Sequence, residues 1–148
     1  MVGGYPSAIV QEYAKEPLSE TQEYMLAQVN ATRAKFGLRP VVLDTTLSCA
    51  ARSWAKRTWR LNICAHFDPV TGQGVRERVE LCGGQLIRGG WEIVACGYPG
   101  VTYAITGWLR SPSHRFVLLN PNVTNVGIGV AGPNLTQSER FYTIVATP

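Results

Sequence analysis

The stretch Val126-Gly127-Ile128-Gly129-Val130 alternates branched apolar residues with glycine, and it guides the interpretation of the whole chain. Alternation with a period of two residues predicts a β-strand. Residues 141–145 (Phe-Tyr-Thr-Ile-Val) show a similar pattern, so the two segments are expected to form an antiparallel hairpin. Gly127 and Gly129 share one face of their strand, and we expect another backbone or a helix to approach the sheet closely there.

Two long helices are predicted ahead of this hairpin. The first begins with a capping box formed by Ser19 and Gln22 and ends at Gly37. Its helically spaced residues are Met25, Val29, Thr32 and Phe36. Asp44 caps the second helix, which is expected to reach Arg60. The inner face of this helix is predicted to carry Leu47, Ala50, Ala51, Trp54, Ala55 and Thr58.

Shorter elements separate the second helix from the hairpin. Residues Val75–Cys82 and Tyr103–Leu109 are predicted to be helical, and Trp91–Cys96 is an apolar segment whose single charge is Glu92. Helices come first and strands last, which favours an α+β fold with an antiparallel sheet. A chain of 148 residues is expected to form one domain. Residues 1–18 are interpreted as an extended arm and residues 19–148 as that domain.

Composition excludes several classes of protein. Charged residues make up 16% of the chain and hydrophobic ones 45%, which does not suit a disordered segment. No apolar run is long enough to span a membrane. No signal-peptide pattern follows Met1, so export would require that such a segment has already been removed.

The net charge of +4 is the only feature that suggests a nucleic-acid partner. Four basic residues share one predicted helix, and they are Arg52, Lys56, Arg57 and Arg60. They form no continuous run and do not alternate with aromatic residues, so we expect no nucleic-acid binding. A solvated helix face is the simplest interpretation, and weak attraction to an anionic surface is the alternative.

The four cysteines, Cys49, Cys64, Cys82 and Cys96, contain no CxxC motif. Their even number predicts two disulfides in an oxidising compartment, and therefore a secreted, extracellular or periplasmic protein. A helix reaching Arg60 would carry the chain about 16 Å away from Cys49. The few residues before Cys64 could return at most about 14 Å. Pairing of Cys49 or Cys64 with Cys82 or Cys96 is therefore favoured, and the connectivity is otherwise open.

The chain has only two histidines, His66 and His114. Ser111 and Pro112 suit the N-cap and first position of a short helix, which would place His114 in its first turn. The positive end of a helix favours the neutral imidazole, the form that a metal ligand or a general base requires. The alternative for either histidine is a polar side chain satisfied by ordinary hydrogen bonds.

Glu92 is the third candidate for chemistry, because burying an unpaired carboxylate is costly. A cleft that faces two imidazoles would relieve that cost. The alternative is a structural ion pair with Arg78 or Arg88.

Several segments together resemble the CAP superfamily of bacterial type, which covers cysteine-rich secretory, antigen 5 and pathogenesis-related proteins and is also called SCP-like. The resemblance spans about residues 19–146. It rests on the order and spacing of Val29-Asn30-x-x-Arg33-x-x-x-Gly37-Leu38-x-Pro40, Asp44-x-x-Leu47-x-x-Ala50-Ala51, His66-Phe-Asp68, Arg78, Trp91-Glu92-Ile-Val-Ala95, Trp108-Leu-x-Ser111-Pro112-x-His114-Arg115 and Val126-Gly-Ile128-Gly-Val130.

The resemblance implies an α-β-α sandwich with a small antiparallel sheet and a central cleft. His66 and His114 match the two histidines of the family, which often bind zinc, and Glu92 matches the first of its two acids. Ser111 stands where the second acid is expected. A zinc ion on two imidazoles would lack the usual third protein ligand, so any affinity should be modest.

The resemblance favours a monomeric, secreted binding module over an enzyme. Its ligand would be a lipid or sterol, a glycan or a surface protein, held by His66, Glu92, Ser111 and His114. Trp59, Trp91 and Tyr103 are candidate apolar walls.

Two alternatives stay open. A metal-assisted peptidase would use Glu92 as general base, with a metal on His66 and His114. A Cys–His enzyme is conceivable only with free thiols at Cys64 or Cys96. The other alternative is a structural or interaction role at the cell envelope.

Overall fold

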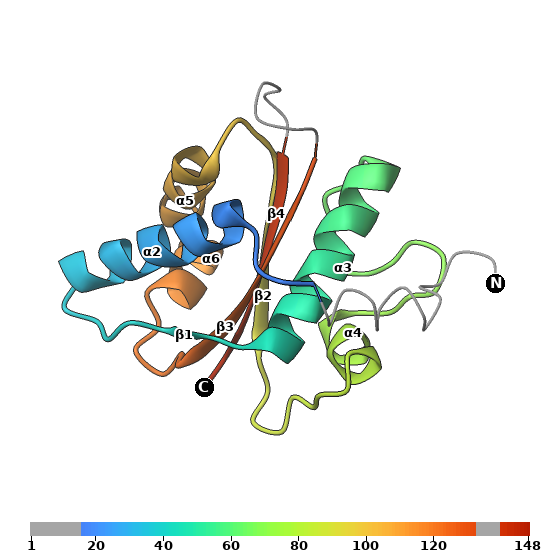
Figure 1. The fold of residues 1–148 in the computed structure, drawn as a ribbon, viewed down its shortest axis with the longest axis horizontal. Helices are drawn as coiled ribbons and strands as arrows, with labels where there is room; N and C mark the ends of the chain where they lie inside the picture. Colours follow the sequence, from blue (N-terminus) through green and yellow to red (C-terminus); the bar gives the residue numbers. More distant parts are fainter. Residues whose placement is uncertain (1–15, 133–139) are drawn as a thin grey trace.

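The computed structural model describes residues 16–132 and 140–148, which form three layers with a sheet between two groups of helices (Figure 1). The α-β-α sandwich implied by the resemblance is therefore confirmed. The elements in chain order are α2 (Glu20–Lys35), β1 (Val42–Leu43), α3 (Thr45–Leu61), α4 (Val75–Leu81), β2 (Trp91–Tyr98), α5 (Val101–Arg110), α6 (Pro112–Leu118), β3 (Asn125–Ala131) and β4 (Arg140–Thr147).

The sheet has four strands in the order β1-β3-β4-β2, so β2 lies at one edge. The predicted hairpin is confirmed, because β3 and β4 pair in antiparallel orientation with Ile128 opposite Ile144. The sheet as a whole is mixed rather than purely antiparallel. The two-residue strand β1, which has no alternating pattern long enough to reveal it, pairs with β3 in parallel.

Helix α3 lies directly against the backbone of β3, as the glycines predicted. A Cβ atom built on Gly127 would overlap the backbone of Leu47 and Ser48, and one on Gly129 would overlap that of Ala51 and Arg52. The predicted inner face of α3 is buried throughout. Helices α3 and α4 cover one face of the sheet, and α2, α5 and α6 cover the other (Figure 1).

Each face of the sheet carries its own apolar cluster. The larger cluster lies under α2, α5 and α6 and includes Met25, Trp108 and Ile144. The smaller one joins α3 and α4 to β4 through Leu47, Val79 and Val145. The alternation of β4 sends Ile144 to one cluster and Val145 to the other, which accounts for its burial on both faces.

The first helix begins and ends as predicted, and it differs from a regular apolar stripe only in its last turn. Ser19 and Gln22 form the capping box, and Gly37 adopts the positive φ of a helix terminator. Phe36 is half exposed rather than part of the core. The buried residue of the last turn is instead Arg33, whose guanidinium donates hydrogen bonds to the carbonyls of Leu118 and Asn120.

Two disulfides join Cys49 to Cys82 and Cys64 to Cys96. Both are pairings of Cys49 or Cys64 with Cys82 or Cys96, as predicted from the length of α3, which separates Cys49 from Cys64. The expected arm is mostly residues 1–15, which lie outside the described part of the chain. At its end, Glu16 forms ion pairs with Lys56 at 3.4 Å and with Arg52 at 3.9 Å.

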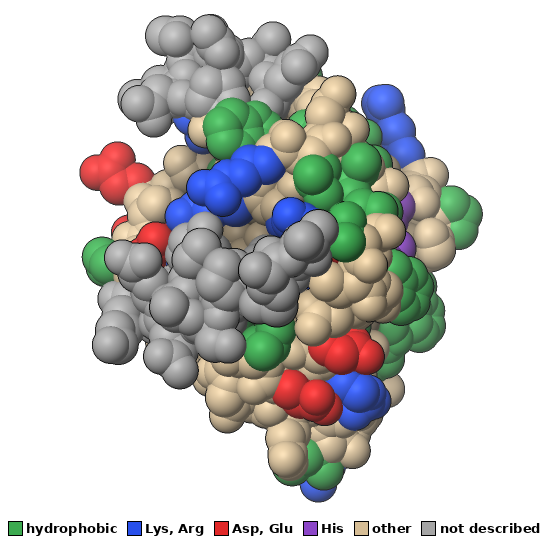
Figure 2. Space-filling view, turned by 90° about the vertical axis from the view of Figure 1, so that its right-hand side faces the viewer, with side chains coloured by type: hydrophobic (Ala, Val, Ile, Leu, Met, Phe, Trp, Pro, Cys, Tyr) green, Lys and Arg blue, Asp and Glu red, His purple; other side chains and the backbone are tan. Residues whose placement is uncertain are grey.

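Basic side chains gather on the face of the molecule shown in Figure 2. Three of the four basic residues predicted to share a helix, Arg52, Lys56 and Arg57, are tied to acidic partners of this chain. Besides the two pairs with Glu16, Arg57 binds the buried carboxylate of Asp68 at 2.9 Å. Part of the positive charge is therefore neutralised within the fold.

Replacing Gly127 with alanine should destabilise the protein by about 3 kcal/mol, because the added methyl group forces α3 away from the sheet. Urea unfolding measures the change. The control is Gly100→Ser at the N-cap of α5, where an added Cβ meets only a ring atom of Tyr103 at 3.9 Å. Equal stability of the two variants would contradict the proposed close contact.

Candidate functional site

Glu92 lies on the edge strand β2 with its carboxylate almost fully buried. One carboxylate oxygen, Oε2, accepts a hydrogen bond of 2.6 Å from Nη2 of Arg78. The other, Oε1, lies 3.0 Å from Nδ1 of His66. Both predicted environments of Glu92 therefore occur together, a structural ion pair and a contact with an imidazole, and Arg78 rather than Arg88 is the basic partner.

Arg78 is a buried cation on α4 with 1% of its surface exposed. Its guanidinium lies 3.9 Å from the centre of the Trp54 ring, a cation–π contact. It also donates to the backbone carbonyls of His66 at 3.0 Å and Gln73 at 3.1 Å. These contacts offset the cost of burying the charge and join α3, α4, β2 and the loop between α3 and α4.

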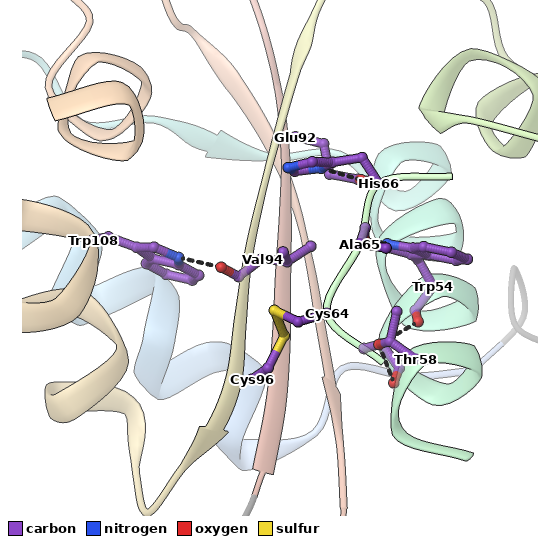
Figure 3. Close-up of a disulfide and its surroundings, with 10 residues drawn as sticks. Trp54, Thr58, Cys64, Ala65, His66, Glu92, Val94, Cys96 and Trp108 are labelled. Carbon is purple, nitrogen blue, oxygen red and sulfur yellow. Dashed lines mark hydrogen bonds and ion pairs between the residues drawn. A yellow bond between two sulfur atoms is a disulfide. The ribbon is translucent and has the colours of Figure 1, made fainter. Parts of the chain in front are cut away.

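The loop that carries His66 is held at several points (Figure 3). The disulfide from Cys64 attaches it to β2, and the indole N–H of Trp54 donates to the carbonyl of Ala65 at 2.9 Å. Further along the loop, Asp68 accepts hydrogen bonds from the backbone of Val70 and from Arg57. The imidazole itself stays 48% exposed. The backbone is fixed, and the ring faces solvent above a buried carboxylate.

Asp68 is ionised in this arrangement. Burial alone would raise the pKa of its carboxyl, but the hydrogen bond and charge of Arg57 and the two backbone N–H donors outweigh that effect and lower the pKa. The Asp68 carboxylate therefore orders the middle of the loop, and Arg78 holds the loop on either side through the carbonyls of His66 and Gln73.

His114 approaches from the opposite layer. It lies in the first turn of α6, as predicted, with Ser111 at the N-cap position and Pro112 in the first turn. The Ser111 hydroxyl makes no capping bond and lies 3.5 Å from the Ser113 hydroxyl. The pKa of His114 is lowered, first by burial and second by the charge of His66. The neutral form predicted for His114 is thus favoured, although burial rather than the helix end is the main cause.

The position of β2 at the sheet edge explains how two histidines from different layers influence each other. His66 follows α3 on one face and His114 belongs to α6 on the other, and in the described part of the chain no strand lies beyond β2. The structure thus brings His66 and Glu92 into direct contact and places His114 within electrostatic reach of His66. Ser111 is the N-cap residue of α6, so it lies one helical turn from His114. These four residues are called the histidine site below.

The donor set fits zinc poorly. Structural and catalytic zinc sites in proteins generally have at least three protein ligands. Within residues 16–132 and 140–148, no group of three or more His, Cys, Asp or Glu side chains is arranged to hold a metal. Both oxygens of Glu92 are already engaged, and Ser111 supplies a hydroxyl in place of an acid. Zinc binding by His66 and His114 stays a prediction.

The aromatic residues predicted as walls lie in different settings. Trp59 and Tyr103 are 41% and 63% exposed. Trp91 is partly buried, and its ring meets that of Phe116 edge to face with centroids 6.3 Å apart. Their role in a ligand site remains a prediction. Sequence reasoning missed Trp54 as the platform for Arg78, because an inner-face tryptophan on a helix gives no signal beyond core packing.

One large groove has no residue of the histidine site in its lining. Its volume is about 540 Å³, and it lies at the N-terminal end of α3, where Thr46, Val79 and Leu86 contribute to its lining. The loop after α3 turns back along the helix, because Ala65 is bound by Trp54 in the middle of α3 and His66 by Arg78.

No described helix has the length and apolar character needed to cross a bilayer.

Comparisons with known proteins identify the family of this chain. The family model described as CAP, the cysteine-rich secretory protein family, matches residues 26–145. The protein YkwD of Bacillus subtilis is 28% identical over 128 residues, which are 86% of this chain and 49% of YkwD. The membrane protein YlbC of the same organism is 28% identical over 90% of this chain and 38% of its own length. The chain thus spans half or less of these curated relatives.

Solved structures show the same fold. An outer surface protein of Borrelia burgdorferi superposes with a TM-score of 0.74 at 21% identity, covering 88% of this chain and 94% of that protein. An extracellular protein of Bacillus anthracis with an SCP domain gives a TM-score of 0.71 at 20% identity, covering 88% of this chain and 45% of that protein. The family match covers most of the sequence, so this chain belongs to the CAP, or cysteine-rich secretory protein, family.

Proposed function

We propose that this CAP domain is an extracellular binding module whose histidine site takes a hydroxyl-rich ligand, a glycan. The observation that carries the proposal is the half-exposed imidazole of His66, held by a buried carboxylate that is itself paired with a buried arginine. A buried ion pair contributes little net stability. Its presence beneath an exposed imidazole therefore favours a role in orienting that ring for a ligand.

The shape of the site favours a glycan over a lipid or sterol. An enclosed apolar cavity suits a lipid best, whereas the cavity in the larger core, between Val29 and Ile144, has a volume of only about 10 Å³. The groove of about 540 Å³ includes no residue of the histidine site. The histidine site is open and offers imidazole and hydroxyl groups. Such groups form hydrogen bonds with sugar hydroxyls, and they do so best when the imidazoles are neutral.

The extracellular location rests on the cysteines. All four are paired, and disulfides of this kind persist in oxidising compartments. The similar proteins from Borrelia burgdorferi and Bacillus anthracis are described as an outer surface protein and an extracellular protein. These descriptions are consistent with the proposal for this chain.

A peptidase is the second candidate, and the contacts of Glu92 argue against its simplest form. A general base must be within reach of the attacking water, whereas the Glu92 side chain is only 3% exposed and lies between Arg78 and His66. Pairing of all cysteines also leaves no thiolate for a Cys–His enzyme. A structural role at the cell envelope would leave the site without a ligand.

Substitution of either histidine should weaken glycan binding at least tenfold, because each removes a hydrogen-bonding group from the site. His66→Ala and His114→Ala are compared with wild type by calorimetry, using soluble cell-wall and host-type oligosaccharides as probes. Tyr24→Ala, at an exposed position on α2, is the control and should bind normally. Saturable binding of sterol or fatty acid without any glycan binding would refute the proposal, as would equal binding by all variants.

The lowered pKa of His114 should make the free energy of unfolding depend on pH. Its pKa lies below the ordinary 6.5 in the folded protein, so below pH 6.5 the unfolded chain takes up this proton first. The free energy of unfolding should therefore fall between pH 7 and pH 5 more steeply in wild type than in His114→Gln. Urea unfolding at several pH values measures the two slopes, and an equal or steeper slope in the variant would disprove the assignment.

A further inference from the structure

We propose that Arg78 is the built-in cation of the histidine site, and that it makes His66 a hydrogen-bond acceptor toward the ligand. This inference rests on the proposed function and deepens it, because it states which polarity the ligand must present. It also accounts for the poor fit to zinc. The positive charge that balances Glu92 is supplied by the protein itself, from a guanidinium with 1% of its side-chain surface exposed.

The polarity of His66 follows from its partner. The Glu92 side chain is paired with the Arg78 guanidinium at 2.6 Å, and a carboxylate in such an ion pair can only accept hydrogen bonds. Nδ1 of His66, 3.0 Å from Oε1, must therefore donate and carry the ring proton. In the neutral imidazole, Nε2 then has a lone pair and no hydrogen. The nitrogen left for a ligand is an acceptor.

Arg78 is fixed in this role by four contacts on β2, α3 and the loop between α3 and α4. It pairs with Glu92 on β2, stacks on Trp54 of α3 and donates to the carbonyls of His66 and Gln73. A planar guanidinium can satisfy these directions together, which a lysine ammonium cannot. A divalent cation approaching Glu92 would have to displace a buried cation from all of these partners.

The ligand class follows from this polarity. A hydroxyl or an amide N–H donates a hydrogen bond to Nε2 of neutral His66, whereas carboxylate and phosphate oxygens only accept. His114, in the first turn of α6, adds a second imidazole to the site. The site should therefore select neutral, hydroxyl-bearing or amide-bearing ligands over acidic ones. For a glycan, this means neutral or N-acetylated sugars rather than sulfated or carboxylated sugars.

The tautomer of His66 can be measured without any ligand. We expect the ¹⁵N chemical shifts of the wild-type protein at pH 8 to show His66 predominantly protonated at Nδ1. In Glu92→Gln, the side-chain amide can donate as well as accept, so the two tautomers should mix. A wild-type His66 protonated mainly at Nε2, or an unchanged pattern in Glu92→Gln, would overturn the assignment.

Zinc titration tests the role of Arg78 as resident cation. Arg78→Met keeps the packing against Trp54 and leaves Glu92 without its cation, so the variant should bind zinc at least tenfold more tightly than wild type. Arg88→Met, at an exposed arginine, is the matched control and should resemble wild type. Tight one-to-one zinc binding by wild type that is lost in His66→Ala would overturn the inference. So would a folded Arg78→Met variant with no gain.

The two proposals fail in distinguishable ways. If Arg78→Met does not fold, as judged by circular dichroism, the tautomer measurement on wild type and Glu92→Gln still decides the inference. If the tautomer is as expected but no oligosaccharide binds, the proposed function fails and the polarity of the site stands. If acidic sugars bind in preference to neutral ones, the glycan function survives and the inferred ligand class is wrong.

Discussion

The backbone contact between α3 and β3 is the constraint on which the rest of the structure depends. At Gly127 and Gly129 the strand has no side chain on the face toward the helix, so the helix backbone rests on the strand backbone. That contact fixes the depth of α3 over the sheet. Trp54 and Cys49 on α3, and the loop that follows the helix, take their positions from it. The histidine site is therefore a consequence of two missing side chains on a strand far along the chain.

Much of the fold could be predicted because its signals are local. The capping box at Ser19, the cap at Asp44 and the alternation in β3 and β4 are properties of a few neighbouring residues, and each occurs as expected. The parallel strand β1 could not be predicted, because two residues carry no period and the pairing depends on a distant strand. Phe36 shares the helical spacing of Met25 and Val29 but is half exposed, because Arg33, a charged residue, fills the buried position in the last turn of the helix.

The sequence indicated which residues are candidates for the site, but it did not indicate which of them contact one another. His66, His114 and Glu92 stood out as rare polar residues in distinctive settings, and Arg78 was one of two arginines considered for Glu92. Proximity across layers is a property of the assembled sheet, so the sequence could not show that Glu92 contacts both Arg78 and His66. The stacking of Arg78 on Trp54 was equally hidden, because both residues have ordinary roles at their local positions.

The placement of the two disulfides has a consequence for the denatured chain. Both lie within the segment from Cys49 to Cys96, with sequence separations of 33 and 32 residues, and neither reaches α2, α6 or the hairpin. When the oxidised chain unfolds, Cys64–Cys96 still holds the residues next to His66 close to those next to Glu92, whereas no disulfide holds His114 near them. His66 and Glu92 thus begin refolding with most of the entropic cost of bringing them together already removed. The segment that carries His114 must still lose that conformational entropy when it folds onto the sheet.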